Sequence, residues 1–345
     1  MHSTKKRVKI AAVIGATALI VGALAGCSKA TSAAPGGSSS TGTKSSFNLV
    51  GVAAYTQDPF WASLQCGATK EAEKEGSKIK WFSSASDLSS STQQANFNAA
   101  MLTKPDALLL ASWQVGTFST QVKGLMAKGT PVIGVNSTIT PATEKVLYVN
   151  GEDNTEFVKY IAKELNGATG TIGVLGGIAG NPDATRRWQP VIDQLKTAAP
   201  NLKALPTQYD DFDRTKSSTV ASALIVAHPD LKALYAISGP EGEGAAAAVK
   251  QAGKSGQIKV YSYGANEAEV VGLKSGLFSA LEGQPAYGLG VEGVKNAIAY
   301  LKTAKPGAAV PQDSPLVVDV PLKVLTKDNV DDPANVQYLQ KSTCS

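Results

Sequence analysis

Histidine is almost absent from the sequence, which leaves few ways to build a catalytic or metal site. The chain contains two, His2 and His228. We expect the segment that holds His2 to be removed, and His228 stands before Pro229, a position typical of a helix end. A Ser–His–acid arrangement therefore lacks its base, and no Cys/His cluster has the spacing of metal ligands. We predict that the protein is not an enzyme and that it holds no metal.

Nucleotide-binding motifs are missing as well. The chain has no GxxxxGK[ST] phosphate loop, and the glycine-rich stretch Gly176–Gly180 lacks the spacing of the dinucleotide fingerprint. We interpret this stretch as a tight turn between a strand and a helix, and adjacent acids such as Asp210-Asp211 as solvated loop residues. Beyond the N-terminus there is no run of basic residues, so we expect no nucleic acid as a partner. We also expect no cofactor.

The N-terminus has the pattern of an export signal. Basic residues without any acid precede an apolar run over residues 10–26. The tetrad Leu24-Ala25-Gly26-Cys27 resembles a bacterial lipobox, in which the Cys becomes the first mature residue and carries the lipid. We therefore predict a lipoprotein signal peptide over residues 1–26 and a lipid anchor on Cys27, at the extracytoplasmic face of the cell membrane. The alternatives are a transmembrane anchor, for which the run is short and rich in Ala and Gly, and a cytosolic protein with an incidental apolar start.

The segment after the signal is predicted to be a flexible tether. Residues 27–46 consist almost entirely of Ser, Thr, Gly, Ala, Lys and Pro, which bury too little apolar surface to offset the entropy of ordering. Two further cysteines, Cys66 and Cys344, would then lie outside the reducing cytosol. They either form a disulfide between the C-terminal tail and an early helix or remain free thiols.

The rest of the chain alternates short β-rich runs with helical runs. Several of the predicted strands are almost wholly apolar, as in Ala107–Ala111, which is typical of parallel sheets covered on both faces. The pattern restarts near residue 147, and the chain exceeds a comfortable single core, so we predict two consecutive α/β units. The predicted strands span residues 48–54, 79–83, 107–111, 131–136, 147–150, 171–175, 202–207, 233–237, 258–263, 279–282 and 316–320. The predicted helices span residues 60–75, 91–103, 116–128, 154–165, 184–198, 214–228, 242–251, 267–275 and 287–301.

Candidate site residues follow from the rule that ligands bind beyond the carboxyl ends of parallel strands. Asp58-Pro59-Phe60-Trp61 follows the first predicted strand, where Asp58 suits a helix cap and Pro59 the first helical turn. The adjacent rings of Phe60 and Trp61 would pack against the C–H surface of a sugar while Asp58 accepts hydroxyl hydrogen bonds. Arg187 lies in the corresponding region of the second unit and would hold vicinal hydroxyls or a carboxylate, unless it is an ordinary surface arginine.

In order and spacing, the chain resembles the ribose-binding-protein branch of the periplasmic binding proteins of ABC transporters, over about residues 47–325. The segments that carry the resemblance include Tyr55–Trp61, Gly177–Gly180, Asp211–Arg214, Ala227–Asp230 and Gln251–Lys254. The resemblance implies an α/β fold of two Rossmann-like lobes, the type I periplasmic binding protein fold, which close on a ligand by hinge motion. The chain is expected to cross between the lobes near Gly151, Gly283 and Asp319. The expected lobes are residues 47–151 plus 284–319, and residues 152–283 plus 320–345 with the tail.

The resemblance also assigns the ligand contacts, together with several departures from the family pattern. The expected contacts are Asp58, Phe60, Trp61, Asn136, Arg187 and Phe212, with Ser238 and Gln284 as further candidates. The family usually has Asp-Arg at Asn136-Ser137, Asn-Asp at Ser238-Gly239, Gly-Phe-Asp at Ser262-Tyr263-Gly264, and Gln at Gly283, beside Gln284. Because the lost groups normally bind hydroxyls, we expect a ligand other than ribose. Candidate replacements are Asn266, Glu241, Glu243, Trp113 and Gln114.

The sequence thus predicts a monomeric, lipid-anchored solute-binding protein. It would capture a small polar ligand, preferably a sugar or polyol, and deliver it to the permease of an ABC transporter. One alternative is a sensory lipoprotein that signals to a membrane receptor, and another is a binder of a non-sugar molecule. An enzyme on a Rossmann scaffold is disfavoured by the missing cofactor motif and histidine. A transcription regulator is disfavoured because a lipoprotein signal, and no helix-turn-helix segment, precedes the first unit.

Overall fold

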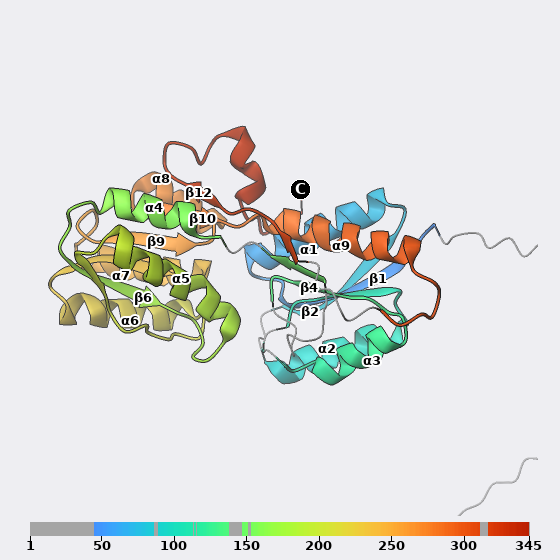
Figure 1. Ribbon diagram of the computed structural model, residues 1–345. Helices are drawn as coiled ribbons and strands as arrows, with labels where there is room; N and C mark the ends of the chain where they lie inside the picture. Colours follow the sequence, from blue (N-terminus) through green and yellow to red (C-terminus); the bar gives the residue numbers. More distant parts are fainter. Residues whose placement is uncertain are drawn as a thin grey trace, which may run out of the picture. The chain divides into compact units, whose positions relative to one another are not determined.

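The computed structural model describes residues 45–85, 89–112, 114, 116–137, 147–150, 153–310 and 317–344 (Figure 1). The predicted signal peptide, Cys27, nearly all of the tether, Trp113 and Gly151 lie outside the described residues. Among the helices of the described segments, none is long and apolar enough to cross a membrane.

The first sheet is wholly parallel, with strand order β11-β5-β4-β3-β1-β2. Its strands are β1 (Asn48–Tyr55), β2 (Lys78–Ser84), β3 (Ala107–Leu110), β4 (Val132–Val135), β5 (Leu147–Asn150) and β11 (Val317–Asp319). The helices that cover it are α1 (Pro59–Lys74), α2 (Ser90–Leu102), α3 (Ser119–Ala127) and α9 (Ala286–Thr303).

Successive side chains of β3 explain how this sheet is covered on both faces. Ala107 and Leu109 pack with α1 and α9, whereas Leu108 and Leu110 pack with α2 and α3. The period of two in a strand sends neighbours to opposite faces, so an entirely apolar strand needs helices on both sides. This arrangement confirms the parallel sheet that the apolar run Ala107–Ala111 predicts.

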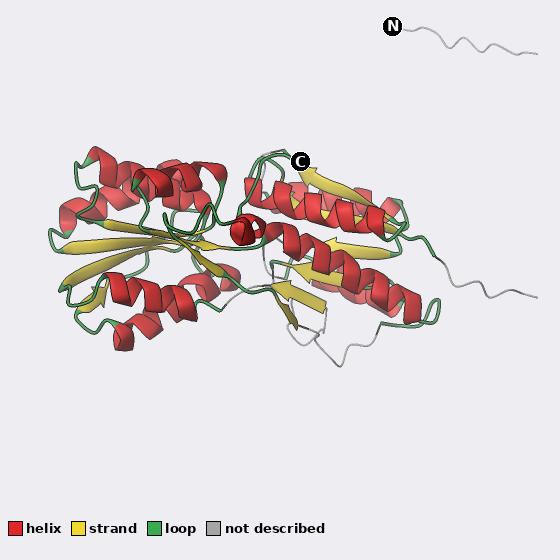
Figure 2. Ribbon diagram, turned by 90° about the horizontal axis from the view of Figure 1, so that it is seen from above, coloured by secondary structure: helices red, strands yellow, loops and turns green. Residues whose placement is uncertain are grey.

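The second sheet repeats the same winding in the order β12-β10-β9-β8-β6-β7. It is parallel except for β12, which runs antiparallel to β10 at the edge. Figure 2 shows its strands between two layers of helices. The strands are β6 (Gly170–Leu175), β7 (Leu202–Ala204), β8 (Leu231–Ala236), β9 (Lys259–Tyr263), β10 (Ala280–Gly283) and β12 (Lys323–Leu325). The helices are α4 (Thr155–Glu164), α5 (Pro182–Ala198), α6 (Arg214–Ala227), α7 (Gly239–Gln251) and α8 (Glu267–Ser275).

Two connections between the sheets lie within the described residues. Strand β10 of the second sheet leads through Gln284 and Pro285 into α9, which packs on α1 and the first sheet. The chain then forms β11 in the first sheet and β12 in the second, so it crosses again at residues 320–322. Both sheets reverse their strand order beside their first strand, and a ligand is expected at such a switch point.

The C-terminal tail contacts both units. After β12 it forms the short 3-10 helix η1 (Pro333–Tyr338), and the backbone N–H of Gln340 then donates to the carbonyl of Ala265, 2.9 Å away. Cys344 is joined by a disulfide to Cys66 of α1, with 5.3 Å between the two Cα atoms. The tail, which was expected with the second lobe, is attached to elements of both units.

Candidate ligand-binding site

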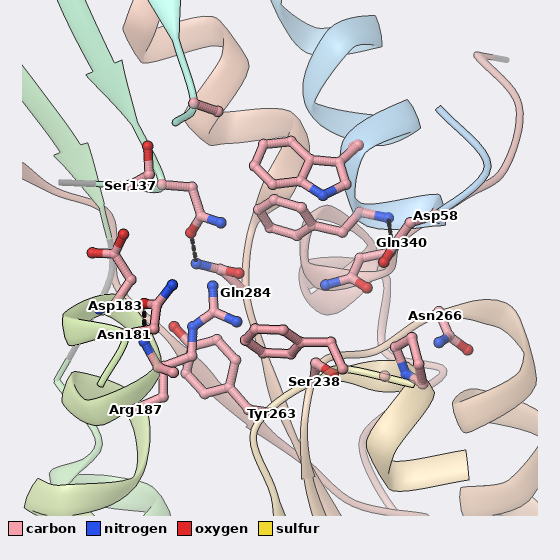
Figure 3. A pocket seen from close by; sticks show the side chains of 18 of the residues that line it. Asp58, Ser137, Asn181, Asp183, Arg187, Ser238, Tyr263, Asn266, Gln284 and Gln340 are labelled. Atoms are coloured by element: carbon pink, nitrogen blue, oxygen red, sulfur yellow. Dashed lines mark hydrogen bonds between the residues drawn. The ribbon is translucent and has the colours of Figure 1, made fainter. Parts of the chain in front are cut away.

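One pocket gathers side chains from the carboxyl ends of strands in both sheets (Figure 3). It contains all the ligand contacts that the sequence predicts: Asp58, Phe60, Trp61, Asn136, Arg187, Phe212, Ser238 and Gln284. The remaining lining residues are Ala111, Ser112, Ser137, Asn181, Asp183, Ala184, Gly239, Pro240, Tyr263, Asn266 and Gln340. Residues separated by more than 200 positions in the chain thus meet in one place, because parallel strands of each sheet end at the same edge.

The aromatic wall of the pocket is positioned by the start of α1. The carboxylate of Asp58 accepts a hydrogen bond from the backbone N–H of Phe60 at 2.8 Å and so caps the helix. Pro59 occupies the first turn, where its missing N–H costs nothing. The rings of Phe60 and Trp61 meet edge to face with 5.0 Å between their centroids. The capping and ligand-contact interpretations of Asp58 are compatible, because the residue both caps α1 and lines the pocket.

A pair of buried amides connects the first sheet to the segment between β10 and α9. The Nε2 of Gln284 donates to the Oδ1 of Asn136 over 2.6 Å. Asn136 follows β4 in the left-handed backbone region, with φ of 55°, a conformation that Asn adopts more readily than most residues. Side-chain amides both donate and accept hydrogen bonds, which suits recognition of hydroxyl groups. Gln284, which the sequence alone left uncertain, is therefore a lining residue of the pocket.

Arg187 is held in place on three sides. Its Nη1 donates to the carbonyl oxygen of Ile237 at 3.2 Å, and its guanidinium lies 4.8 Å above the ring of Tyr263. The Tyr235 hydroxyl donates to the backbone oxygen of Arg187 at 3.0 Å and fixes this turn of α5. Figure 3 shows the guanidinium in the pocket beside Gln284. A planar, permanently charged fork in a fixed orientation is suited to binding two neighbouring oxygens.

The glycine-rich turn after β6 determines the position of Phe212. A Cβ on Gly177 would lie 2.6 Å from the Phe212 ring, so only glycine leaves room for that ring. Gly177 also has a φ of 68°, which L-residues rarely adopt. The backbone N–H groups of Asp210 and Asp211 both donate to the Gly177 carbonyl, at 3.0 and 3.1 Å. The interpretation of Gly176–Gly180 as a tight turn agrees with this geometry. The turn also leaves space for the ring of Phe212, which lines the pocket.

The solvated interpretation of Asp210 is wrong. Its side chain is only 1% exposed and accepts a hydrogen bond from the Ser217 hydroxyl at 2.6 Å. Nearby, the Glu241 carboxylate accepts from the Gly177 N–H at 2.8 Å. Burial, followed by the negative charge of Asp210, raises the pKa of Glu241 well above its ordinary value. These acids support the turn from beneath, and neither lines the pocket.

Of the proposed replacement residues that the structure describes, Asn266 alone lines the pocket, and Trp113 lies outside the described residues. Its Oδ1 accepts from the Glu269 N–H at 2.9 Å, and the Glu269 carboxylate accepts in return from the Asn266 N–H at 2.9 Å, which forms a capping box at the start of α8. Its Nδ2 donates to Glu243 at 3.1 Å, and Glu243 also pairs with Arg214 at 3.0 Å. Glu241, Glu243 and Gln114 do not line the pocket.

Beneath the pocket lie two buried carboxyl groups that the sequence did not single out. Burial raises the pKa of Glu269 to about 7, although its Oε1 accepts from the Ser262 hydroxyl at 2.6 Å. Burial likewise raises the pKa of Glu282 to about 8, while a hydrogen bond of 2.9 Å from Asn154 opposes the shift. The pKa values of both carboxyl groups are therefore close to neutral pH. Both residues belong to the buried structure that supports the pocket.

Several lining residues were not chosen as ligand contacts from the sequence. Asn181 had an available signal, because Asn directly before Pro182 is a helix-cap pattern, and its Oδ1 indeed accepts from the N–H groups of Asp183 and Ala184 at 2.9 and 3.0 Å. The sequence carries no comparable signal for Gln340, because this residue lies in the tail and follows no predicted strand.

Two mainly parallel α/β sheets with a shared polar and aromatic pocket at their carboxyl ends define a two-lobed ligand-binding protein. The sequence profile described as periplasmic binding protein domain matches residues 50–306, and the chain belongs to this family. The fold is that of the type I periplasmic binding proteins, as the resemblance implies.

The chain is similar to sugar-binding proteins in sequence and in structure. It is 31% identical over 271 residues to the ribose import binding protein RbsB of Escherichia coli, covering 77% of this chain and 89% of that protein. It is 25% identical over 277 residues to the D-ribose/D-allose-binding protein of Pseudomonas aeruginosa, covering 77% and 85%. A solute-binding protein of an ABC transporter from Agrobacterium vitis, bound with α-D-tagatopyranose, matches with a TM-score of 0.73 and 26% identity over 85% of this chain and 99% of that one.

Proposed function

We propose that this protein binds a monosaccharide or a related polyol in the described pocket and delivers it to the permease of an ABC transporter. The observation that carries the proposal is the composition of the pocket, in which aromatic rings and fixed polar groups are combined. Phe60, Trp61 and Phe212 supply flat apolar faces, and Arg187 with the Asn136–Gln284 pair supplies hydrogen bonds. A sugar ring has the matching surface, with C–H faces and a rim of hydroxyl groups.

The relatives support a sugar as the ligand class. Their names refer to ribose, D-allose and D-apiose, and a similar structure holds D-tagatose. The lining of this pocket has amide and hydroxyl groups at Asn136, Ser137 and Ser238, where the ribose-binding pattern has charged or amide side chains. We infer from these differences that the preferred ligand is a sugar or polyol other than ribose.

The location and the domain boundaries are part of the same proposal. Residues 1–26 would direct export, Cys27 would carry the lipid, and residues 27–46 would tether the binding unit outside the membrane as a monomer. The lobes would comprise residues 47–151 plus 284–319 and residues 152–283 plus 320–345. The role is binding without catalysis, which agrees with the names of the relatives as binding proteins.

A thermal-shift screen tests the ligand class. The mature chain, residues 27–345, is heated with D-ribose, D-allose, D-apiose, D-tagatose, the corresponding polyols, amino acids and nucleosides. A ligand present at 100 times its Kd stabilises the folded state by about 2.7 kcal/mol, which raises the melting temperature by several degrees. A shift confined to amino acids or nucleosides would overturn the sugar proposal, and turnover of a bound sugar would overturn the non-catalytic role.

A further inference from the structure

Gln340 lies in the C-terminal tail and reaches the pocket from outside both sheets. It lines the pocket, is 5% exposed, and lies beside Asp58 in Figure 3. Within the described part of the chain, no protein group is hydrogen-bonded to its side-chain amide, although its backbone is bonded to Ala265 at 2.9 Å. The side-chain amide lines the pocket with its hydrogen-bonding groups unused by the described residues, so it is available to pair with a ligand there.

The backbone of this residue is fixed on both sides. Towards the second sheet, Gln340 forms a parallel bridge with Asn266. Towards the first, the neighbouring Lys341 accepts a hydrogen bond from the Ser63 hydroxyl at 3.1 Å and donates one to it at 2.7 Å. Gln340 is therefore held between an element of each unit, one residue away from its attachment to α1.

The disulfide keeps this attachment in place. Ser63 and Cys66 are three residues apart on α1 and thus lie on one face of the helix, and Cys344 is bonded to Cys66. A chain end without such a bond frays readily. With the bond, the tail is confined to the rim of the pocket, and the ordering cost of using Gln340 for binding is lowered before the ligand arrives.

We propose that Gln340 contacts the bound sugar and helps to determine which sugar is accepted, and that the Cys66–Cys344 disulfide positions it for this contact. The inference rests on the proposed function, since it requires a sugar in the pocket. The amide offers two donors and one acceptor oxygen, enough to distinguish sugars that differ in one hydroxyl.

Titration calorimetry on the mature chain tests the contact with the sugar of the panel that binds most tightly. Gln340→Ala is expected to lower the affinity for that sugar about tenfold, because one well-placed hydrogen bond is lost. A series of deoxy analogues should contain one that wild type and Gln340→Ala bind equally, namely the analogue that lacks the hydroxyl contacted by Gln340. The matched control is Gln337→Ala, an exposed tail residue whose side-chain amide donates to the carbonyl of Ala334 in η1 at 3.3 Å, and its affinities should equal those of wild type.

The double variant Cys66→Ser/Cys344→Ser tests the positioning role. It should reproduce the change in sugar preference of Gln340→Ala, and adding Gln340→Ala to it should cause little further loss. If it does not fold, the Gln340→Ala series alone decides. An equal loss for every sugar and analogue would show that the tail only supports the fold, and would overturn the inference while leaving the proposed function intact. Failure of wild type to bind any sugar or polyol would instead overturn the proposed function, and this inference with it.

Discussion

Arg187 enters the pocket already oriented. Its contacts with Ile237 and Tyr263 leave the planar guanidinium in the pocket, as Figure 3 shows. Because the side chain is already oriented, less rotamer entropy is lost on binding. Lys could not replace it fully, because a single ammonium group cannot donate two parallel hydrogen bonds as the guanidinium does.

Removing this fork should lower affinity without unfolding the protein. Arg187→Ala is expected to weaken binding of the preferred sugar about 10- to 100-fold, because hydrogen bonds from a charged donor contribute about 1.5–3 kcal/mol. Arg187→Lys should recover only part of the loss. Titration calorimetry measures the affinities, and Lys196→Ala, on the exposed face of the same helix, serves as the control that should bind normally. Wild-type affinity in Arg187→Ala would place the ligand elsewhere.

Trp61 should contribute through its ring and not through its polar N–H. Aromatic contacts of this kind contribute about 0.5–1.5 kcal/mol beyond the apolar area that they bury, so Trp61→Ala is expected to weaken sugar binding up to about tenfold. Trp61→Phe keeps a flat ring next to Phe60 and should lose much less. Calorimetry gives the comparison, and equal losses in both variants would argue against ring packing.

Individual turns decide whether these side chains reach the pocket, and the turn at Gly177 is the clearest case. Gly177→Ala adds a methyl group 2.6 Å from the Phe212 ring and places alanine at φ of 68°. The backbone conformation alone costs about 1–2 kcal/mol, which lowers the melting temperature by a few degrees. Displacement of Phe212 should add a loss of sugar affinity.

Gly253→Ala separates the two effects. Gly253 has nearly the same φ, 67°, but no atom lies within 4 Å of its added Cβ. This variant should therefore show the loss in melting temperature without any loss in affinity. If Gly177→Ala bound sugar as well as Gly253→Ala does, Phe212 would have no part in binding.

The order of strands and helices could be predicted from the sequence because apolar strands and amphipathic helices carry periodic signals. β12 and η1 were not predicted, because the antiparallel edge strand β12 and the short 3-10 helix η1 both follow the last repeat of strand and helix in the tail. The starts of α5 and α7 lie a few residues earlier than predicted, at Pro182 and Gly239, where Pro in the first turn begins the helix.

The pocket was predictable as far as it follows strand ends. Asp58, Asn136, Arg187 and Ser238 come after strands in the expected way. Gln340 could not be found by this rule, because its position depends on the course of the tail and on a disulfide. The burial of Asp210 was missed because its partner Ser217 lies on α6 and nothing in the local sequence indicates the contact.

For the whole molecule, the buried carboxyl groups predict that stability falls as the pH rises. Burial raises the pKa of Glu269 to about 7 and that of Glu282 to about 8, from the ordinary carboxyl value of 4.5 that applies to the unfolded chain. At a pH between 4.5 and these raised pKa values, the two carboxyl groups have lost their protons in the unfolded chain but keep them in the folded chain. Stability contributed by these groups is therefore complete at acidic pH and is lost as the pH rises towards 8.

Calorimetric melting without ligand should show this dependence. The melting temperature is expected to be lower at pH 8.5 than at pH 5.5, and Glu282→Gln should reduce the difference, because glutamine still accepts a hydrogen bond from Asn154 but does not ionise. Glu292→Gln, an exchange of a carboxylate on α9 paired with Lys295, should leave the difference as in wild type. A melting temperature that rises between these pH values would contradict the assignment.

The cross-link between Cys66 and Cys344 spans a sequence separation of 278 residues and makes the two units one covalent ring. A single peptide-bond cleavage in any loop between these cysteines opens the ring but releases no fragment. Such a nicked molecule migrates as one chain in a denaturing gel and separates into pieces only after reduction. After such a cut, the disulfide would therefore still join the two fragments of the chain covalently.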